Sequence, residues 1–143
     1  MTADRKEWMS VLAKAPAARL AALLPDLPKH DFLRPPEIGA VMVQGRTGAT
    51  GAPFNLGEMS VTRCSLRLAD GPVGHAYVQG RDKGHATRAA IVDALMQTKG
   101  ALAIQTNVLA PLRTEAAARR DLRAGKAAAT KVEFFTMVRG EDQ

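Results

Sequence analysis

Two copies of one tetrapeptide contain the side chains in this sequence that are best suited to binding a charged ligand. Val-Gln-Gly-Arg occurs at residues 43–46 and again at residues 78–81, each time at the end of an apolar run that predicts a strand. Each arginine follows a glycine, which lets a ligand approach the backbone closely. The second copy leads through Lys83 and His85 into a predicted helix, whose free N–H groups and dipole favour anions. The candidate contacts for a phosphate, a phosphonate or a partner's carboxylate are therefore Arg46, Arg81, Lys83 and His85.

A second interpretation of the repeat is two ordinary strand ends with exposed arginines, because every helix has a free N-terminus. The glycine-rich residues 45–57 do not strengthen the case for a nucleotide. A Walker loop ends in Gly-Lys-Ser/Thr and the dinucleotide fingerprint opens a helix, whereas Pro53 follows the glycines here. We expect a loop that becomes ordered on a partner.

The remaining reactive residue types do not form the pattern of a catalytic or metal site. The three histidines lack metal-ligand spacing, and no acidic cluster accompanies them. Cys64 alternates with two leucines, which predicts a buried and inert thiol. A Cys64–His75 nucleophile pair across a hairpin is the alternative. We therefore predict no catalytic residue and no metal ligand in this chain.

Composition favours a globular protein with acidic or phosphorylated partners. The 143 residues carry a formal net charge of +6, with 46% hydrophobic and 24% charged residues. Aromatic residues make up only 4%, which argues against the stacking platforms of a specific nucleic-acid site. The apolar residues 8–24 are interrupted by Lys14, Pro16 and Arg19, so no membrane span is predicted. We expect a cytoplasmic protein.

Helices at the start of the chain would position the other residues. Residues 4–24 have a capping box and helical spacing of apolar side chains. Trp8 and Met9 open this segment, either as core residues or as anchors of an interface. Four prolines within residues 25–36 predict a connector that turns the chain.

The rest of the sequence predicts a sheet with further helices. Strands are expected at residues 38–44, 59–68, 73–79 and 132–138, with a hairpin between the second and third because Asp-Gly separates them. Helices are expected from Asp82 to about residue 96 and from Thr114 onward. The predicted fold is α+β, an antiparallel sheet of about four strands with helices packed against it. It forms one domain over residues 1–143, with a helical segment at 4–24 and the sheet and helices at 37–140.

Five segments together carry a family resemblance. They are Arg5 with residues 8–13, and then residues 78–83, 93–97, 110–112 and 134–140. In their order and spacing they resemble the PhnG family, the G subunits of bacterial carbon–phosphorus lyase systems.

The resemblance implies a subunit of a core complex with the H, I and J subunits. With the H, I and L proteins, such a subunit is required for the step in which methylphosphonate displaces adenine from MgATP, giving α-D-ribose 1-methylphosphonate 5-triphosphate. Cleavage of the C–P bond follows on the J subunit, whose iron–sulfur cluster needs cysteines that this chain lacks.

The family supplies no catalytic motif for this chain. We therefore expect it to bind no cofactor, although the complex uses MgATP, and to be inactive as an isolated chain within a transferase assembly. A small-molecule or nucleotide-binding module outside that complex, and an RNA-associated basic protein, are the alternatives.

Overall fold

The computed structural model describes the backbone of residues 3–69 and 71–141, and the side chains of these residues except 3, 49 and 131–141. The chain divides into two units, Met1–Leu112 and Arg113–Gln143. The first unit contains the sheet and most of the helices. Each unit is described by itself.

Two short helices begin the first unit, as the sequence predicts. They are α1 (Ala3–Lys14) and α2 (Ala17–Leu23). Pro16 precedes α2 with a φ of −60°, which proline adopts without strain. Leu12 and Leu20 are fully buried, so both helices contribute to the core.

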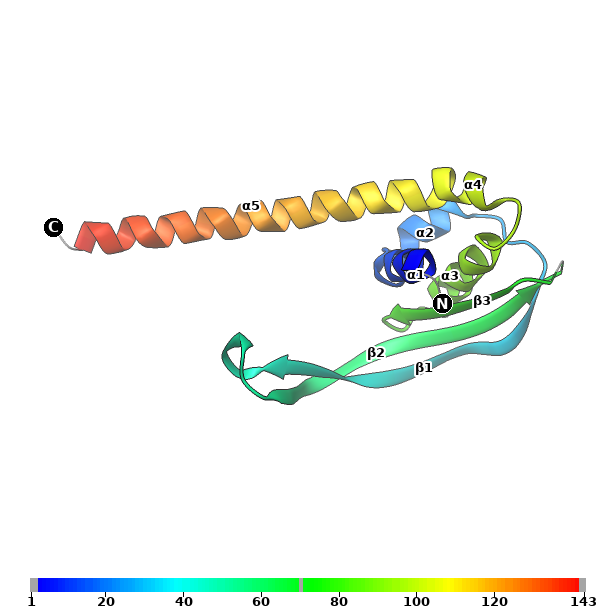
Figure 1. Cartoon of the computed structure of the whole chain (residues 1–143), viewed down its shortest axis with the longest axis horizontal. Helices are drawn as coiled ribbons and strands as arrows, with labels where there is room; N and C mark the ends of the chain where they lie inside the picture. Colours follow the sequence, from blue (N-terminus) through cyan, green and yellow to red (C-terminus); the bar gives the residue numbers. More distant parts are fainter. Residues whose placement is uncertain (1–2, 70, 142–143) are drawn as a thin grey trace. The chain divides into compact units, whose positions relative to one another are not determined.

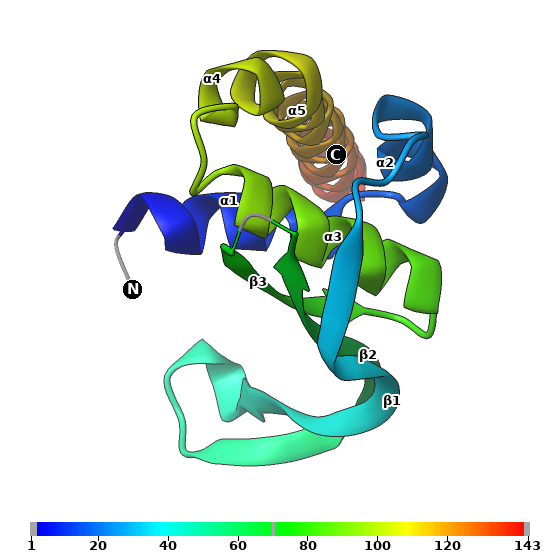
Figure 2. The same cartoon turned by 90° about the vertical axis from the view of Figure 1, so that its right-hand side faces the viewer.

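The sheet has three antiparallel strands in the order β1-β2-β3. They are β1 (His30–Arg46), β2 (Pro53–Leu68) and β3 (Val73–Gln79). Figures 1 and 2 show that β1 and β2 continue as a long ribbon past the end of the much shorter β3. The α+β class is confirmed, with three strands instead of about four.

β1 is much longer than predicted, because it includes most of the segment expected to be a connector. Pairing with β2 begins at His30, and the register shifts twice before Glu37. These irregularities accommodate Pro35 and Pro36, which have no N–H to donate. β1 is an edge strand of the sheet, the position in which proline is tolerated. The loop expected at residues 45–57 is reduced to a tight tip, with a 3-10 turn at Thr47–Ala49.

Helix α3 (Lys83–Leu95) covers one face of the sheet and is the centre of the core. Asp82 caps it, as predicted, by accepting a hydrogen bond from the backbone N–H of His85 at 3.0 Å. Cys64 and the neighbouring leucines of β2 point toward this helix and are buried, which confirms the alternation in the sequence. The predicted hairpin is also confirmed by the antiparallel pairing of β2 with β3.

The C-terminal part is helical throughout. α4 (Ala101–Ile104) and a π-helical turn, Gln105–Leu109, lead into α5 (Ala110–Glu141). The strand predicted at residues 132–138 is wrong, because α5 continues through it. No proline follows Pro111, and residues 113–130 are rich in alanine and arginine, which favour a helix. No helix in the described part of the chain is long and apolar enough to cross a membrane.

Candidate functional site

The buried carboxylate of Asp93 joins three elements of the first unit. Its Oδ1 accepts hydrogen bonds from Arg5 Nε at 3.1 Å and Trp8 Nε1 at 2.8 Å. Its Oδ2 accepts from Arg5 Nη2 and from the backbone N–H of His75, both at 2.8 Å. The hydrogen bond with Asp93 raises the pKa of Arg5, so the guanidinium stays charged. Asp93 therefore fixes α1 and β3 to α3.

The burial of Asp93 has a signal in the sequence. Asp93 interrupts an apolar run, residues 89–96, in the sequence of a predicted helix, and residues 89–94 are all buried in the structure. An aspartate at such a position must find partners, because an unpaired buried charge is very costly. Trp8, predicted as a core residue or an interface anchor, packs against the core and donates to Asp93. Trp8 is partly buried, so its packing against the core leaves its role as an interface anchor a prediction.

The predicted anion contacts at the start of α3 divide into buried and exposed residues. His85 is 5% exposed, and its Nε2 donates to the backbone carbonyl of Leu12 at 2.8 Å. This ring links α3 to α1 and is not available to a ligand. Arg81 and Lys83 are exposed on the loop and first turn that follow β3. Among the predicted anion contacts at the start of α3, Arg81 and Lys83 are therefore the two cations that a partner can reach.

The two arginines of the repeat lie far apart, although their strands run in the same direction. β3 ends at Gln79, opposite Val61 of β2, whereas β1 ends at Arg46, opposite Pro53. These two positions are eight residues apart along β2, which is about 26 Å on an extended strand. Arg46 instead donates through Nη1 to the carbonyl of Gly51 at 3.2 Å, across the tip of the ribbon. The structure does not bring Arg46 and Arg81 to one shared contact.

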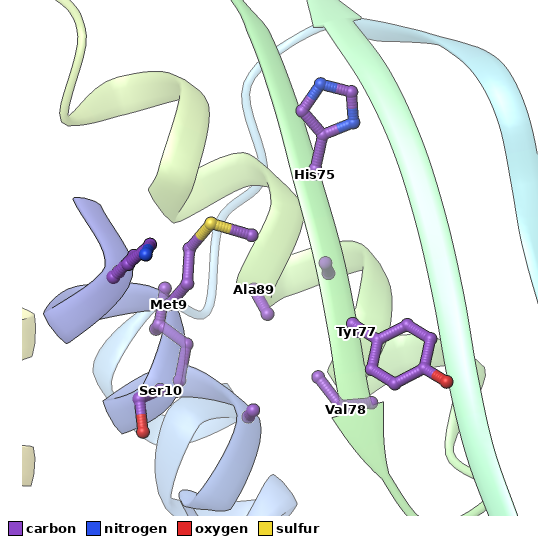
Figure 3. Close-up of a pocket in the computed structure, with 10 residues that line it drawn as sticks. Met9, Ser10, His75, Tyr77, Val78 and Ala89 are labelled. Carbon is purple, nitrogen blue, oxygen red and sulfur yellow. The ribbon is translucent and has the colours of Figure 1, made fainter. Parts of the chain in front are cut away.

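A groove runs between α1 and the free edge of β3 (Figure 3). Its volume is about 270 Å³. Met9 and Ser10 of α1 line one side, and Tyr77 and Val78 of β3 line the other, with Ala89 of α3 between them. Met9, predicted as a core residue or an anchor, is therefore a half-buried wall of this groove. The lining is mostly apolar and includes one cation, Lys6.

The distal part of the β1–β2 ribbon exposes large apolar side chains. We use "the ribbon" for residues 41–46 and 53–59, which pair with each other beyond the end of β3. Met42, Phe54 and Leu56 are 52%, 44% and 62% exposed. Apolar side chains gathered on a projecting element are typical of a surface that another protein covers.

The reactive side chains do not form the nucleophile pair that the sequence left open. Cys64 is opposite Ala76 and His75 is opposite Ser65, so Cys64 and His75 lie on opposite faces of the sheet. Burial raises the pKa of the Cys64 thiol to about 11, which keeps it protonated. The His75 ring is exposed, and its Nδ1 lies 2.9 Å from Ser65 Oγ. Within the described residues, no group of three or more His, Cys, Asp or Glu side chains could hold a metal ion.

Comparison with known proteins gives one consistent result over nearly the whole chain. Residues 3–140 match the model of the family described as phosphonate metabolism protein PhnG. The chain is also 44% identical over 147 residues to the alpha-D-ribose 1-methylphosphonate 5-triphosphate synthase subunit PhnG of Rhizobium meliloti (strain 1021). That alignment covers 98% of this chain and 92% of the relative. These two matches show that this small α+β protein belongs to the PhnG family of phosphonate metabolism.

Proposed function

We propose that this chain is an accessory, non-catalytic subunit of the α-D-ribose 1-methylphosphonate 5-triphosphate synthase in a cytoplasmic carbon–phosphorus lyase system. It acts with the H, I and L proteins, and it belongs to a core complex with the H, I and J subunits. The reaction transfers the ribose 5-triphosphate moiety of MgATP to methylphosphonate. The bond between ribose and adenine breaks, a phosphonate oxygen takes adenine's place, and adenine is released.

The exposed ribbon is the observation that carries this proposal. A two-stranded antiparallel ribbon without a third strand is only marginally stable in water. This ribbon extends past β3 and exposes Met42, Phe54 and Leu56 to solvent. A partner that covers these side chains removes apolar surface from water and stabilises the ribbon at the same time. The chain thus contributes a binding surface. MgATP is a substrate of the complex as a whole and is not held by this chain alone.

The proposal is tested first by assembly and turnover. A tagged copy, expressed in cells with methylphosphonate as the sole phosphorus source, is expected to co-purify with the H, I and J proteins. Adenine release by the reconstituted H, I and L mixture is expected to require this chain. The isolated chain is expected to release no adenine from MgATP and methylphosphonate. Robust adenine release by the isolated chain would overturn the accessory role.

A surface variant then asks whether the ribbon makes the contact. The double variant Phe54→Ser/Leu56→Ser is expected to lower the yield of co-purified partners at least about tenfold, since a few apolar anchors carry most interface energy. Leu102→Ser is the matched control, because Leu102 is an even more exposed leucine, 79% accessible, on α4. Both proteins are expected to keep the melting temperature of the parent chain. Equal yields from the ribbon variant and the control would show that the ribbon is not the contact.

A further inference from the structure

The free edge of β3 has an unpaired row of backbone groups. β3 is the last strand of the sheet, so within residues 3–69 and 71–141 one of its edges has no neighbouring strand. Gly80 N–H donates to the Ser60 carbonyl and Leu68 N–H donates to the Pro72 carbonyl, each at 2.9 Å. Because hydrogen-bonded pairs alternate in an antiparallel ladder, the even-numbered residues of β3 bond to β2. The N–H and C=O groups of the odd-numbered residues therefore point to the free edge; these residues are Val73, His75, Tyr77 and Gln79.

The chain itself satisfies only the beginning of this edge. The N–H of His75 donates to Asp93 Oδ2, and the carbonyl of Val73 accepts from Gln97 Nε2, both at 2.8 Å. Among the described residues, no partner bonds to the His75 carbonyl, to either backbone group of Tyr77 or to the N–H of Gln79. Four successive edge groups, alternately acceptor and donor, are therefore open over residues 75–79.

The groove beside α1 follows these open groups (Figure 3). Ala76 and Val78, which face α3, line it together with His75 and Tyr77, which face the opposite side. Residues from both faces of a strand line one groove only if the groove runs along the strand edge. A strand added to an edge lies about 4.8 Å from its neighbour, and its side chains alternate between the two faces. A groove between a helix and an edge strand is a known arrangement for binding extended peptides.

The positive charge around the groove favours an occupant with acidic groups. Lys6 lines the groove, and Arg81 and Lys83 are exposed just past the end of β3. None of the lining residues is acidic. An extended segment with an apolar side chain toward Met9 and Val78, and with carboxylates at its ends, matches this surface in shape and charge.

We infer that the free edge of β3 binds an extended, acidic-ended segment of another subunit of the synthase by β-strand addition. The added strand accepts a hydrogen bond from Tyr77 N–H, donates to Tyr77 C=O, and lies between β3 and α1. This inference rests on the proposed function, because it names the surface through which one subunit of the complex is held. It uses a different part of the molecule from the ribbon.

Hydrogen exchange of the unaltered chain, free and in the assembled complex, is the direct test. The amides of Ala76 and Val78 bond to β2 and are expected to be protected in both states. The amides of Tyr77 and Gln79 point to the open edge and are expected to exchange at least about tenfold more slowly after assembly. Unchanged exchange at both amides in a complex that forms normally would overturn the inference and leave the proposed function standing. Failure of the complex to form at all would overturn both the inference and the proposed function.

Two variants separate the backbone contact from the groove. Tyr77→Pro removes the outward N–H without removing a bond to β2, and Tyr77→Thr is its control, because threonine keeps the N–H. Loss of one such hydrogen bond is expected to weaken assembly by about three- to tenfold relative to Tyr77→Thr. Ser10→Trp fills the groove from α1, whereas Ala22→Trp makes the same kind of change on an exposed position of α2. Only the Ser10 variant is expected to reduce assembly.

The oligomeric state of the purified chain supplies the remaining outcome. A dimer of the isolated chain that becomes a monomer on Tyr77→Pro would show that the edge pairs with a second copy. That result would overturn the assignment to another subunit. Assembly by Tyr77→Pro and Ser10→Trp at the level of their controls would show that nothing binds at the edge.

Discussion

Asp93 is the buried carboxylate through which α1, β3 and α3 are joined. It is fully buried and accepts four hydrogen bonds from Arg5, Trp8 and His75. Asp93→Ala leaves these donors without an acceptor, and the loss of one member of a buried ion pair costs about 3–5 kcal/mol. Asp93→Asn keeps the shape but directs an NH₂ group toward donors, so we expect a smaller loss, about 2 kcal/mol. Urea denaturation measures both.

The exposed ion pair between Glu37 and Arg63 is the control for Asp93. Its atoms are 3.5 Å apart, and the two side chains are 58% and 49% exposed. Exposed pairs of this kind contribute little, so Glu37→Ala is expected to change the free energy of unfolding by less than about 1 kcal/mol. If Asp93→Ala were as stable as Glu37→Ala, the buried network would not hold the elements together.

Cys64 is expected to react very slowly with thiol reagents in the folded protein. Its pKa is raised by burial from 9.0 to about 11, and the reactive species is the thiolate. At pH 8 the thiolate fraction is therefore about a hundredfold lower than that of an ordinary thiol. The control is Cys64→Ser/Ala103→Cys, which moves the thiol to an exposed position on α4. Similar labelling rates for the two proteins in a disulfide-exchange assay would contradict the burial of Cys64.

At the scale of elements, the close approach of β3 to α3 depends on Gly74. A Cβ at Gly74 would lie 1.8 Å from the carbonyl oxygen of Ala90 and 2.8 Å from the N atom of Ala94. Both atoms are helix backbone and cannot rotate away, so Gly74→Ala must separate the strand from the helix. We expect a loss of more than about 3 kcal/mol in the free energy of unfolding, measured by thermal or urea denaturation.

Gly39 of β1 provides a matched substitution in the same sheet. A Cβ there meets no atom within 4 Å, so Gly39→Ala is expected to be neutral or slightly stabilising. Equal stability of Gly39→Ala and Gly74→Ala would mean that β3 and α3 are not packed as closely as described. This pair of glycines tests the packing of two elements without touching a polar contact.

At the scale of the whole molecule, the first unit is expected to fold without the second. All buried residues of the described side chains lie at or before Leu112, the last residue of the first unit. A chain that ends at Arg120 keeps these residues and two further turns of α5. We expect it to melt cooperatively within about 5 °C of the full chain in a calorimetric scan. A truncated chain with no cooperative transition would show that residues 121–143 are needed for the core.

Local signals in the sequence determined the elements whose causes are local. The helices of residues 4–24 follow from the periodicity of apolar side chains. The start of α3 follows from the cap at Asp82, and the β2–β3 hairpin follows from turn residues between the two strands. The same is true of the inward face of Cys64, which follows from alternation along one strand. The structure confirms these predictions. They could be made from the sequence because each depends only on residues close together in the chain. The family resemblance also depended on sequence alone.

Contacts between residues far apart in the sequence determined the remaining features of the fold and of the candidate site. β1 begins at His30 because it pairs with β2 despite two prolines, and its length separates Arg46 from Arg81. Trp8 and Asp93 are 85 positions apart, and their hydrogen bond arises only when α1, β3 and α3 pack together. The open edge of β3 likewise follows from the strand order, which no stretch of sequence encodes by itself. Register and burial are properties of elements already in contact, so only the tertiary structure could place the charged and open groups that a partner meets.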